Sequence, residues 1–101
     1  MNTFHLEIKT PDTLLFSGQV ESLNVEHPSG NEGYLANHEP VLREISSGAV
    51  RFRPVDPTQI SIKENPSEDY FKTELSDGIC KLTISGVFIS FLNNKAVVFV
   101  R

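Results

Sequence analysis

Apolar and polar residues alternate along most of the chain, and this period of two indicates β-strands rather than helices. The first strand is expected over residues 4–9, where polar positions separate Phe4, Leu6 and Ile8. The Thr-Pro-Asp sequence that follows ends it, because Pro cannot donate to a ladder and Asp favours a turn. A second strand is expected over residues 14–25. Its apolar parity slips between Val20 and Leu23, which predicts a β-bulge.

The middle of the chain contains turn signals and short apolar runs. Residues 27–33 contain two Gly, one Pro and one Asn and are predicted to form a turn. Short strands are predicted at Tyr34-Leu35 and Val41-Leu42. Ser46-Ser47-Gly48 is predicted to be a hairpin turn that leads into an alternating strand over residues 49–53.

The second half divides into an irregular and a regular part. Prolines interrupt residues 54–78, although residues 59–63 alternate and Tyr70-Phe71 is expected to open another strand. Asp77-Gly78 is a strong signal for a tight turn. The last strands are predicted over residues 80–85, 87–92 and 95–100, with a turn at Asn93-Asn94 because Asn tolerates positive φ.

These elements predict an all-β fold, an antiparallel β-sandwich or flattened barrel of about eight to ten short strands. The 101 residues suit a single domain over residues 1–101, since no repeat or linker divides them. Residues 97–100 are apolar on both sides, and so are residues 87–92 except for Ser90. Each of these strands is therefore either covered by a second layer or meets a partner, and the sequence leaves both alternatives open.

Composition excludes several classes of partner. The net charge is −4 and the basic residues are scattered singly, so nucleic-acid binding is not expected. The one cysteine, Cys80, lies in an apolar alternation, which favours a core position and a reducing compartment. Neither a signal peptide nor an apolar run of about 20 residues is found, so no direct membrane insertion is expected.

Candidate chemistry is sparse. His38 could serve as a general base, but the adjacent Glu39 would point to the opposite face of an extended chain. We therefore expect His38 to hydrogen-bond within a tight loop. The three histidines share no metal-ligand spacing, and the stretch Gly30–Gly33 carries Glu32 where a phosphate loop would carry Lys. No catalytic, metal or nucleotide site, cofactor or small-molecule substrate is predicted.

Several motifs occur together in one order. The opening strand is followed by Thr10-Pro11 and by Leu15-Phe16-Ser17-Gly18-Gln19-Val20. A glycine-rich stretch, Gly30-Asn31-Glu32-Gly33, precedes His38-Glu39-Pro40-Val41-Leu42, and Gly48-Ala49-Val50-Arg51-Phe52 comes next. The hairpin Ser85-Gly86-Val87-Phe88 and the strand Lys95-Ala96-Val97-Val98 complete the series. The order and spacing resemble the amino-terminal domain of the epsilon subunit of F-type ATP synthases.

The resemblance implies a non-catalytic subunit of the central rotor stalk. Such a subunit would link the gamma subunit to the ring of c subunits and couple ion translocation to ATP synthesis, on the cytoplasmic side of the bacterial inner membrane. The family's ring-contact loop carries over to Gly30, Asn31, Glu32, Gly33 and His38. Partners other than gamma and the c-ring are not implied.

The chain also departs from the family pattern. The usual Gly-Gly pair is Gly86-Val87, and an enlarged loop or hairpin is expected at about residues 53–81. The chain stops at Arg101, where the family continues into helices that regulate ATP hydrolysis, so that function does not carry over. Two alternatives are considered. One is a diverged stand-alone interaction module, against which the motif order argues. The other is a small hydrolase or lyase that uses His38, against which the lack of a convergent acid, base and nucleophile argues.

Overall fold

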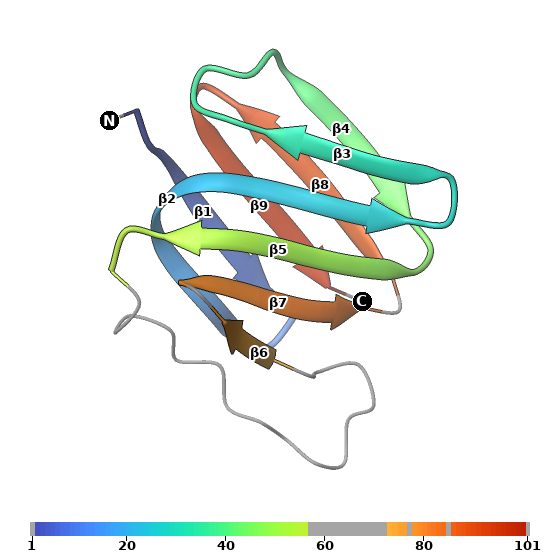
Figure 1. Cartoon of the computed structure of the whole chain (residues 1–101). Helices are drawn as coiled ribbons and strands as arrows, with labels where there is room; N and C mark the ends of the chain where they lie inside the picture. Colours follow the sequence, from blue (N-terminus) through green and yellow to red (C-terminus); the bar gives the residue numbers. More distant parts are fainter. Residues whose placement is uncertain (1, 57–72, 77, 85, 101) are drawn as a thin grey trace.

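The computed structural model describes residues 2–56, 73–76, 78–84 and 86–100, and strands make up most of these residues (Figure 1). The nine strands are β1 (Phe4–Lys9), β2 (Leu14–His27), β3 (Gly30–Tyr34), β4 (Val41–Ile45), β5 (Gly48–Pro54), β6 (Thr73–Ser76), β7 (Ile79–Ile84), β8 (Val87–Leu92) and β9 (Lys95–Val100). The prediction of an all-β fold with eight to ten short strands is confirmed.

The strands form one sheet that folds over into two layers. Hydrogen bonds connect them in the order β4-β8-β9-β1-β2-β5-β7-β6, and β3 pairs with β2 off this path. The long strand β2 belongs to both layers, because its first half pairs with β1 and its second half lies between β3 and β5. One layer therefore holds β4, β8, β9 and β1, and the other holds β3, β5, β7 and β6 (Figure 1). Within the described residues the sheet has free edges at β3, β4 and β6, so it is not closed into a barrel and the fold is a sandwich.

The predicted bulge lies where β2 passes from one layer to the other. The register between β2 and β5 shifts between Val20 and Ser22. Val20 and Leu23 are both buried although they are three residues apart, a spacing that would place them on opposite faces of a regular strand. One extra residue in β2 turns the side chains that follow it to the opposite face. The predicted β-bulge is therefore confirmed.

The core lies between the two layers and is apolar. Phe4, Leu6 and Ile8 of β1 are fully buried, as the alternation of that strand predicts. The rings of Phe16 and Phe52, which come from different layers, pack with centroids 4.7 Å apart. This tilted geometry is one that aromatic pairs prefer, and the contact joins the two layers.

The connection between β4 and β5 differs from the predicted hairpin. β4 pairs with β8 in one layer, whereas β5 pairs with β2 and β7 in the other. Residues 46–47 therefore carry the chain between layers, and the hairpin prediction is wrong. Gly48 has a φ of 150°, and a Cβ at this position would collide with the carbonyl oxygen of Glu26. Only glycine allows this close approach of the two backbones.

Two other turns are confirmed. Ser76 pairs with Ile79 and Leu92 pairs with Lys95, so each hairpin has a two-residue turn. Gly78 has a φ of 76°, and the Asn93-Asn94 turn also has positive φ values. The strands predicted at residues 59–63 and 70–71 lie outside the described residues. The same holds for most of the enlarged segment expected at about residues 53–81, which stays a prediction.

Candidate functional site

Strand β3 occupies the stretch for which the sequence predicted a glycine-rich loop. Only residues 28–29 form the turn, and β3 pairs with the end of β2 from Gly30 opposite His27 to Tyr34 opposite Leu23. The loop prediction for Gly30–Gly33 is therefore wrong. Gly and Asn favour turns locally, but pairing with a buried neighbouring strand overrides that preference.

Glu32 points inward between the layers, and its carboxylate connects two edge strands. It forms an ion pair with Arg43 of β4, and it accepts a hydrogen bond of 3.1 Å from the Tyr34 hydroxyl. Burial and, second, the hydrogen bond to Glu32 raise the pKa of Tyr34 to about 12. We call Glu32, Arg43 and Tyr34 the edge clasp. The Nε2 atom of His27 lies 4.0 Å from the Glu32 carboxylate and has no hydrogen bond among the described residues.

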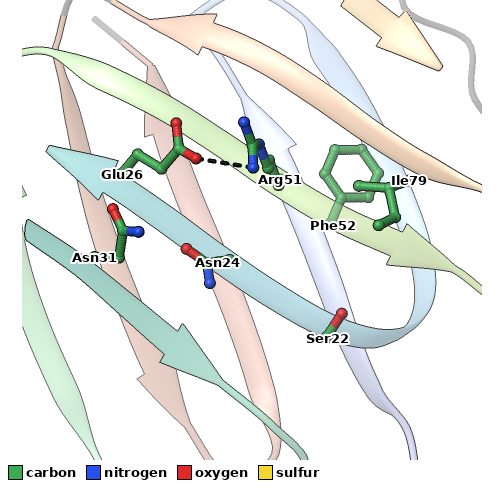
Figure 2. A pocket seen from close by; sticks show the side chains of 7 residues that line it. All are labelled: Ser22, Asn24, Glu26, Asn31, Arg51, Phe52 and Ile79. Atoms are coloured by element: carbon green, nitrogen blue, oxygen red, sulfur yellow. Dashed lines mark ion pairs between the residues drawn. The ribbon is translucent and has the colours of Figure 1, made fainter. Parts of the chain in front are cut away.

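Asn31 and Gly33 have the opposite parity to Glu32 and face outward. Asn31 borders a shallow depression on the outer face of β2, β3 and β5 (Figure 2). Its lining side chains are Ser22, Asn24, Glu26, Asn31, Arg51, Phe52 and Ile79. Glu26 and Arg51 lie 3.0 Å apart and neutralise one another, which leaves amide and hydroxyl groups as the polar surface of this depression.

His38 lies beyond the other end of β3 from Gly30, so the structure does not bring it together with the turn at residues 28–29. Its backbone N–H donates to the Leu35 carbonyl at 3.2 Å, and its Nδ1 lies 2.8 Å from the Glu39 carbonyl oxygen. Its ring packs against Tyr34 and Phe91. The expectation that His38 hydrogen-bonds within a tight loop is confirmed. This packing and bonding give His38 the geometry of a structural residue.

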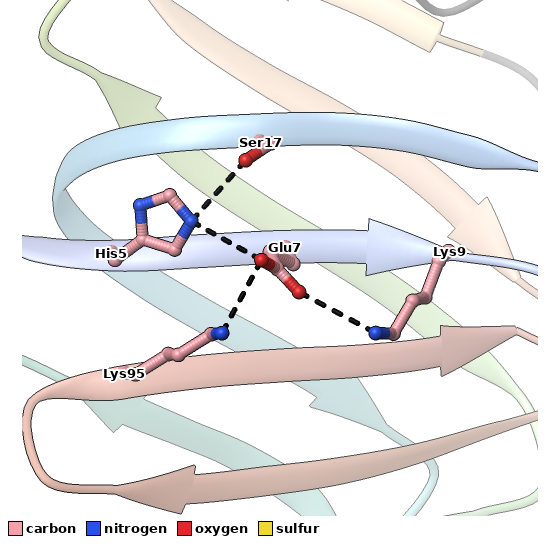
Figure 3. A network of polar contacts seen from close by, with 5 residues as sticks. All are labelled: His5, Glu7, Lys9, Ser17 and Lys95. Atoms are coloured by element: carbon pink, nitrogen blue, oxygen red, sulfur yellow. Dashed lines mark hydrogen bonds and ion pairs between the residues drawn. The ribbon is translucent and has the colours of Figure 1, made fainter.

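A polar network on the outer face of β1 brings a serine, a histidine and a carboxylate together (Figure 3). The Nε2 atom of His5 lies 3.2 Å from the Ser17 hydroxyl and 3.5 Å from the Glu7 carboxylate. A catalytic triad uses both ring nitrogens, one for the nucleophile and one for the carboxylate. Here a single nitrogen faces both groups, so the carboxylate cannot orient the ring as a base toward Ser17.

Glu7 is the centre of that network. Lys95 and Lys9 lie 3.3 and 3.5 Å from its two carboxylate oxygens. Partial burial acts to raise the pKa of Glu7, but the hydrogen bonds and charges of the two lysines outweigh it and hold that pKa below its usual value. The network is a solvated set of ion pairs that covers β1 and β9.

The outer face of β4, β8 and β9 carries four large apolar side chains beside the polar residues Glu44, Ser90 and Lys95. The inward side chains of β8 and β9 are buried, whereas four large apolar side chains on the outer face are exposed, with exposed fractions of 76% for Leu42, 39% for Phe88, 53% for Leu92 and 44% for Phe99. Phe88 and Phe99 lie opposite one another across β8 and β9. One side of these strands is covered by the second layer, as the first alternative has it, and the other side is exposed, so a partner on that side stays a prediction. We call Leu42, Phe88, Leu92 and Phe99 the apolar face.

Other classes of site are not found in the described part of the chain. Among these residues, no group of three or more His, Cys, Asp or Glu side chains could hold a metal ion. Cys80 is buried, and burial raises the pKa of its thiol to about 11. Within the same residues, no helix is long and apolar enough to cross a membrane.

Sequence reasoning missed the clasp partner Arg43 and the outward residue Asn24. Arg43 lies on a different strand and layer from Glu32, so no local spacing links them. The outward position of Asn24 could have been predicted, because it alternates with the apolar residues Leu23 and Val25 of β2.

Comparisons with known proteins agree with this architecture. Residues 3–70 match the family model described as the ATP synthase delta/epsilon chain, β-sandwich domain. The ATP synthase epsilon chain of Rhodopseudomonas palustris (strain BisA53) is 44% identical over 48 residues, which are 48% of this chain and 36% of that protein. The epsilon chain of Priestia megaterium is 32% identical over 60 residues, 59% of this chain and 45% of its relative.

The matched regions span less than half the length of these relatives. One solved structure, of the mitochondrial ATP synthase central stalk and c-ring of Tetrahymena thermophila, contains a chain with the same fold. It aligns with a TM-score of 0.61 at 12% sequence identity over 95% of this chain and 61% of that chain. The match to the family model covers more than half of the sequence, and its described part, residues 3–56, lies in the sandwich. The chain belongs to the family of the ATP synthase delta/epsilon chain β-sandwich domain.

Proposed function

We propose that the chain is a non-catalytic subunit of the central stalk of a bacterial F1Fo ATP synthase. In this role it joins the gamma subunit to the c-ring and couples ion translocation to ATP synthesis. The complex would hold it at the cytoplasmic side of the inner membrane. Family membership supports this proposal, as do relatives that are named ATP synthase epsilon chain.

The observation that carries the proposal is the apolar face. Large exposed side chains on three adjacent strands of one layer form a surface of the kind that soluble proteins use for partners. The outer face of the other layer is polar around Ser22, Asn24 and Asn31. A rigid sandwich with one apolar and one polar outer face can hold two different partners. We assign the apolar face to gamma.

The test is the affinity of the chain for its gamma subunit. Burial of a leucine side chain contributes about 1.5–3 kcal/mol, and about 1.4 kcal/mol corresponds to tenfold in Kd. Leu42→Asp and Leu92→Asp are therefore each expected to weaken gamma binding at least about tenfold. Both side chains are more than half exposed, so the melting temperature should stay within about 2 °C.

Thr83→Asp is the matched control, because Thr83 is exposed on a strand of the opposite layer. It should leave gamma binding unchanged. Wild-type chain that stays monomeric beside its gamma subunit would reject the proposal and favour the stand-alone interaction module instead. If wild type binds and neither leucine variant is weaker, the assignment of the apolar face to gamma is wrong.

A further inference from the structure

The outer face of the layer that contains β4, β8, β9 and β1 carries an ordered row of side chains. Glu44 of β4 lies opposite Phe88 of β8, which lies opposite Phe99 of β9. Phe99 in turn lies opposite Lys9 of β1. Residues that lie opposite one another on neighbouring strands share a face of the sheet. The row therefore has two aromatic side chains at its centre and charges of opposite sign at its two ends.

The side chains of this row are accessible to a partner. Phe88 and Phe99 belong to the apolar face, and Glu44 is exposed. The Lys9 ammonium lies 5.1 Å from the centroid of the Phe99 ring and 3.5 Å from the Glu7 carboxylate. An ammonium group has three donors. Lys9 can therefore bind a second carboxylate without releasing Glu7.

The order of the side chains makes the row complementary to a second copy of itself. In a two-fold dimer, residue i contacts residue j of the other copy and j contacts i. A two-fold axis that runs along the strands between β8 and β9 exchanges the two ends of the row. Glu44 of each copy then faces Lys9 of the other, and Phe88 of each copy faces Phe99 of the other. Sheets that pack face to face keep their strand directions within about 30°, which suits this axis.

The neighbouring rows allow the same packing but add little to it. Leu92 lies opposite Lys95 within the sheet, so in the dimer it meets the aliphatic stem of Lys95 from the second copy. In the row between, Leu42 would face Glu7, whose carboxylate is already neutralised by Lys9 and Lys95. The row of Glu44 and Lys9 therefore determines whether two copies associate, and the dimer should be weak.

We propose that the unassembled chain forms a symmetric homodimer through this face, with a Glu44–Lys9 ion pair at each end and the phenylalanines of both copies between them. This inference goes beyond the proposed function, in which the same face binds gamma. A second copy and gamma need the same side chains, so they compete. The dimer keeps the apolar face out of water until gamma replaces the second copy.

Sedimentation velocity of the purified full chain, over a range of concentrations, tests the inference. The wild-type chain should shift from monomer to dimer as its concentration rises. Glu44→Lys and Lys9→Glu should each weaken the dimer at least about tenfold, because each places two pairs of like charges across the interface. Lys81→Glu is the matched control, since it changes the same charge on the outer face of the opposite layer, and it should dimerise as wild type does.

A mixture of the two variants makes the test specific. In a heterodimer of Glu44→Lys with Lys9→Glu, each lysine again faces a glutamate. The mixture should therefore dimerise about as well as wild type, although neither variant does so alone, and this recovery also shows that both variants are folded.

Three results would overturn the inference: a wild-type chain that stays monomeric, two variants that dimerise as wild type does, or a mixture that stays monomeric where wild type dimerises. None of these experiments contains gamma, so the proposed function is tested separately.

Discussion

Substitution of Glu32 is expected to destabilise the fold, although family resemblance places this residue in a contact with a partner. The perturbation is Glu32→Lys. It removes the acceptor of the Tyr34 hydroxyl and places a second cation beside Arg43. Tyr34 is 3% exposed, so its hydroxyl loses its acceptor in a buried position.

The magnitude follows from these contacts. Leaving a buried donor without a partner costs about 1–3 kcal/mol. The ion pair adds little, about 0–1 kcal/mol, because the Arg43 side chain is 47% exposed and solvent screens it. A loss of roughly 2 kcal/mol is therefore expected for the free energy of unfolding. For a domain of this size it corresponds to a decrease of roughly 8–16 °C in melting temperature.

Urea denaturation followed by circular dichroism measures this free energy directly. Glu26→Lys is the matched control, because Glu26 also pairs with an arginine but on the outer face and without a tyrosine. It should cost about 1 kcal/mol or less. Equal losses for the two variants would refute the role of the clasp. Any weakening of ring binding by Glu32→Lys should also disappear when binding is compared at equal fractions of folded protein.

Three further predictions concern single residues. Gly48→Ala should lower the melting temperature more than Gly30→Ala does. Both glycines have positive φ, but only at Gly48 would a Cβ collide with the Glu26 carbonyl oxygen. Equal decreases would contradict the close approach of the Gly48 and Glu26 backbones. The pKa of Tyr34 is about 12 in the folded state, above its value near 10 in the unfolded state. The hydrogen-bonded hydroxyl should therefore contribute fully to the free energy of unfolding below pH 10, and this contribution should be lost as the pH rises through 12. Denaturation curves measured across that range should show the decline. Cys80 should react with a thiol reagent such as DTNB only as fast as the chain unfolds, since it is buried and its pKa is about 11; rapid reaction in native buffer would show an accessible thiol.

Local patterns predicted the parts of the fold that depend on local chemistry. Alternation of apolar and polar residues identified β1 and the last strands, and the slip of parity in β2 located its bulge. Asp77-Gly78 and Asn93-Asn94 marked hairpins, because turns of two residues need positive φ.

Features that depend on pairing between distant segments were not visible in the sequence. Gly30–Gly33 looks like a turn and is a strand because β2 lies beside it. Ser46-Ser47-Gly48 has the composition of a hairpin turn, yet it crosses between layers. β1 and β9 run parallel, contrary to the expected antiparallel order, since alternation records only the face of each residue and not the direction of its neighbour.

The candidate contact residues were likewise predictable only where local sequence determines them. The family motif named the segment Gly30–Gly33, whose role as a contact stays a prediction, and the alternation along β3 then separates the outward Asn31 from the inward Glu32. The partner of Glu32 could not be predicted, because Arg43 reaches it from the other layer.

Co-purification tests the central claim most directly. The tagged chain is produced in cells that contain the cognate ATP synthase, and the membranes are solubilised in mild detergent before capture. If the chain is a central-stalk subunit, gamma and c subunits should be retained in fixed proportion to it, and Leu42→Asp should lose most of the gamma subunit. Recovery of the wild-type chain without gamma, from membranes that contain an intact synthase, would contradict the account.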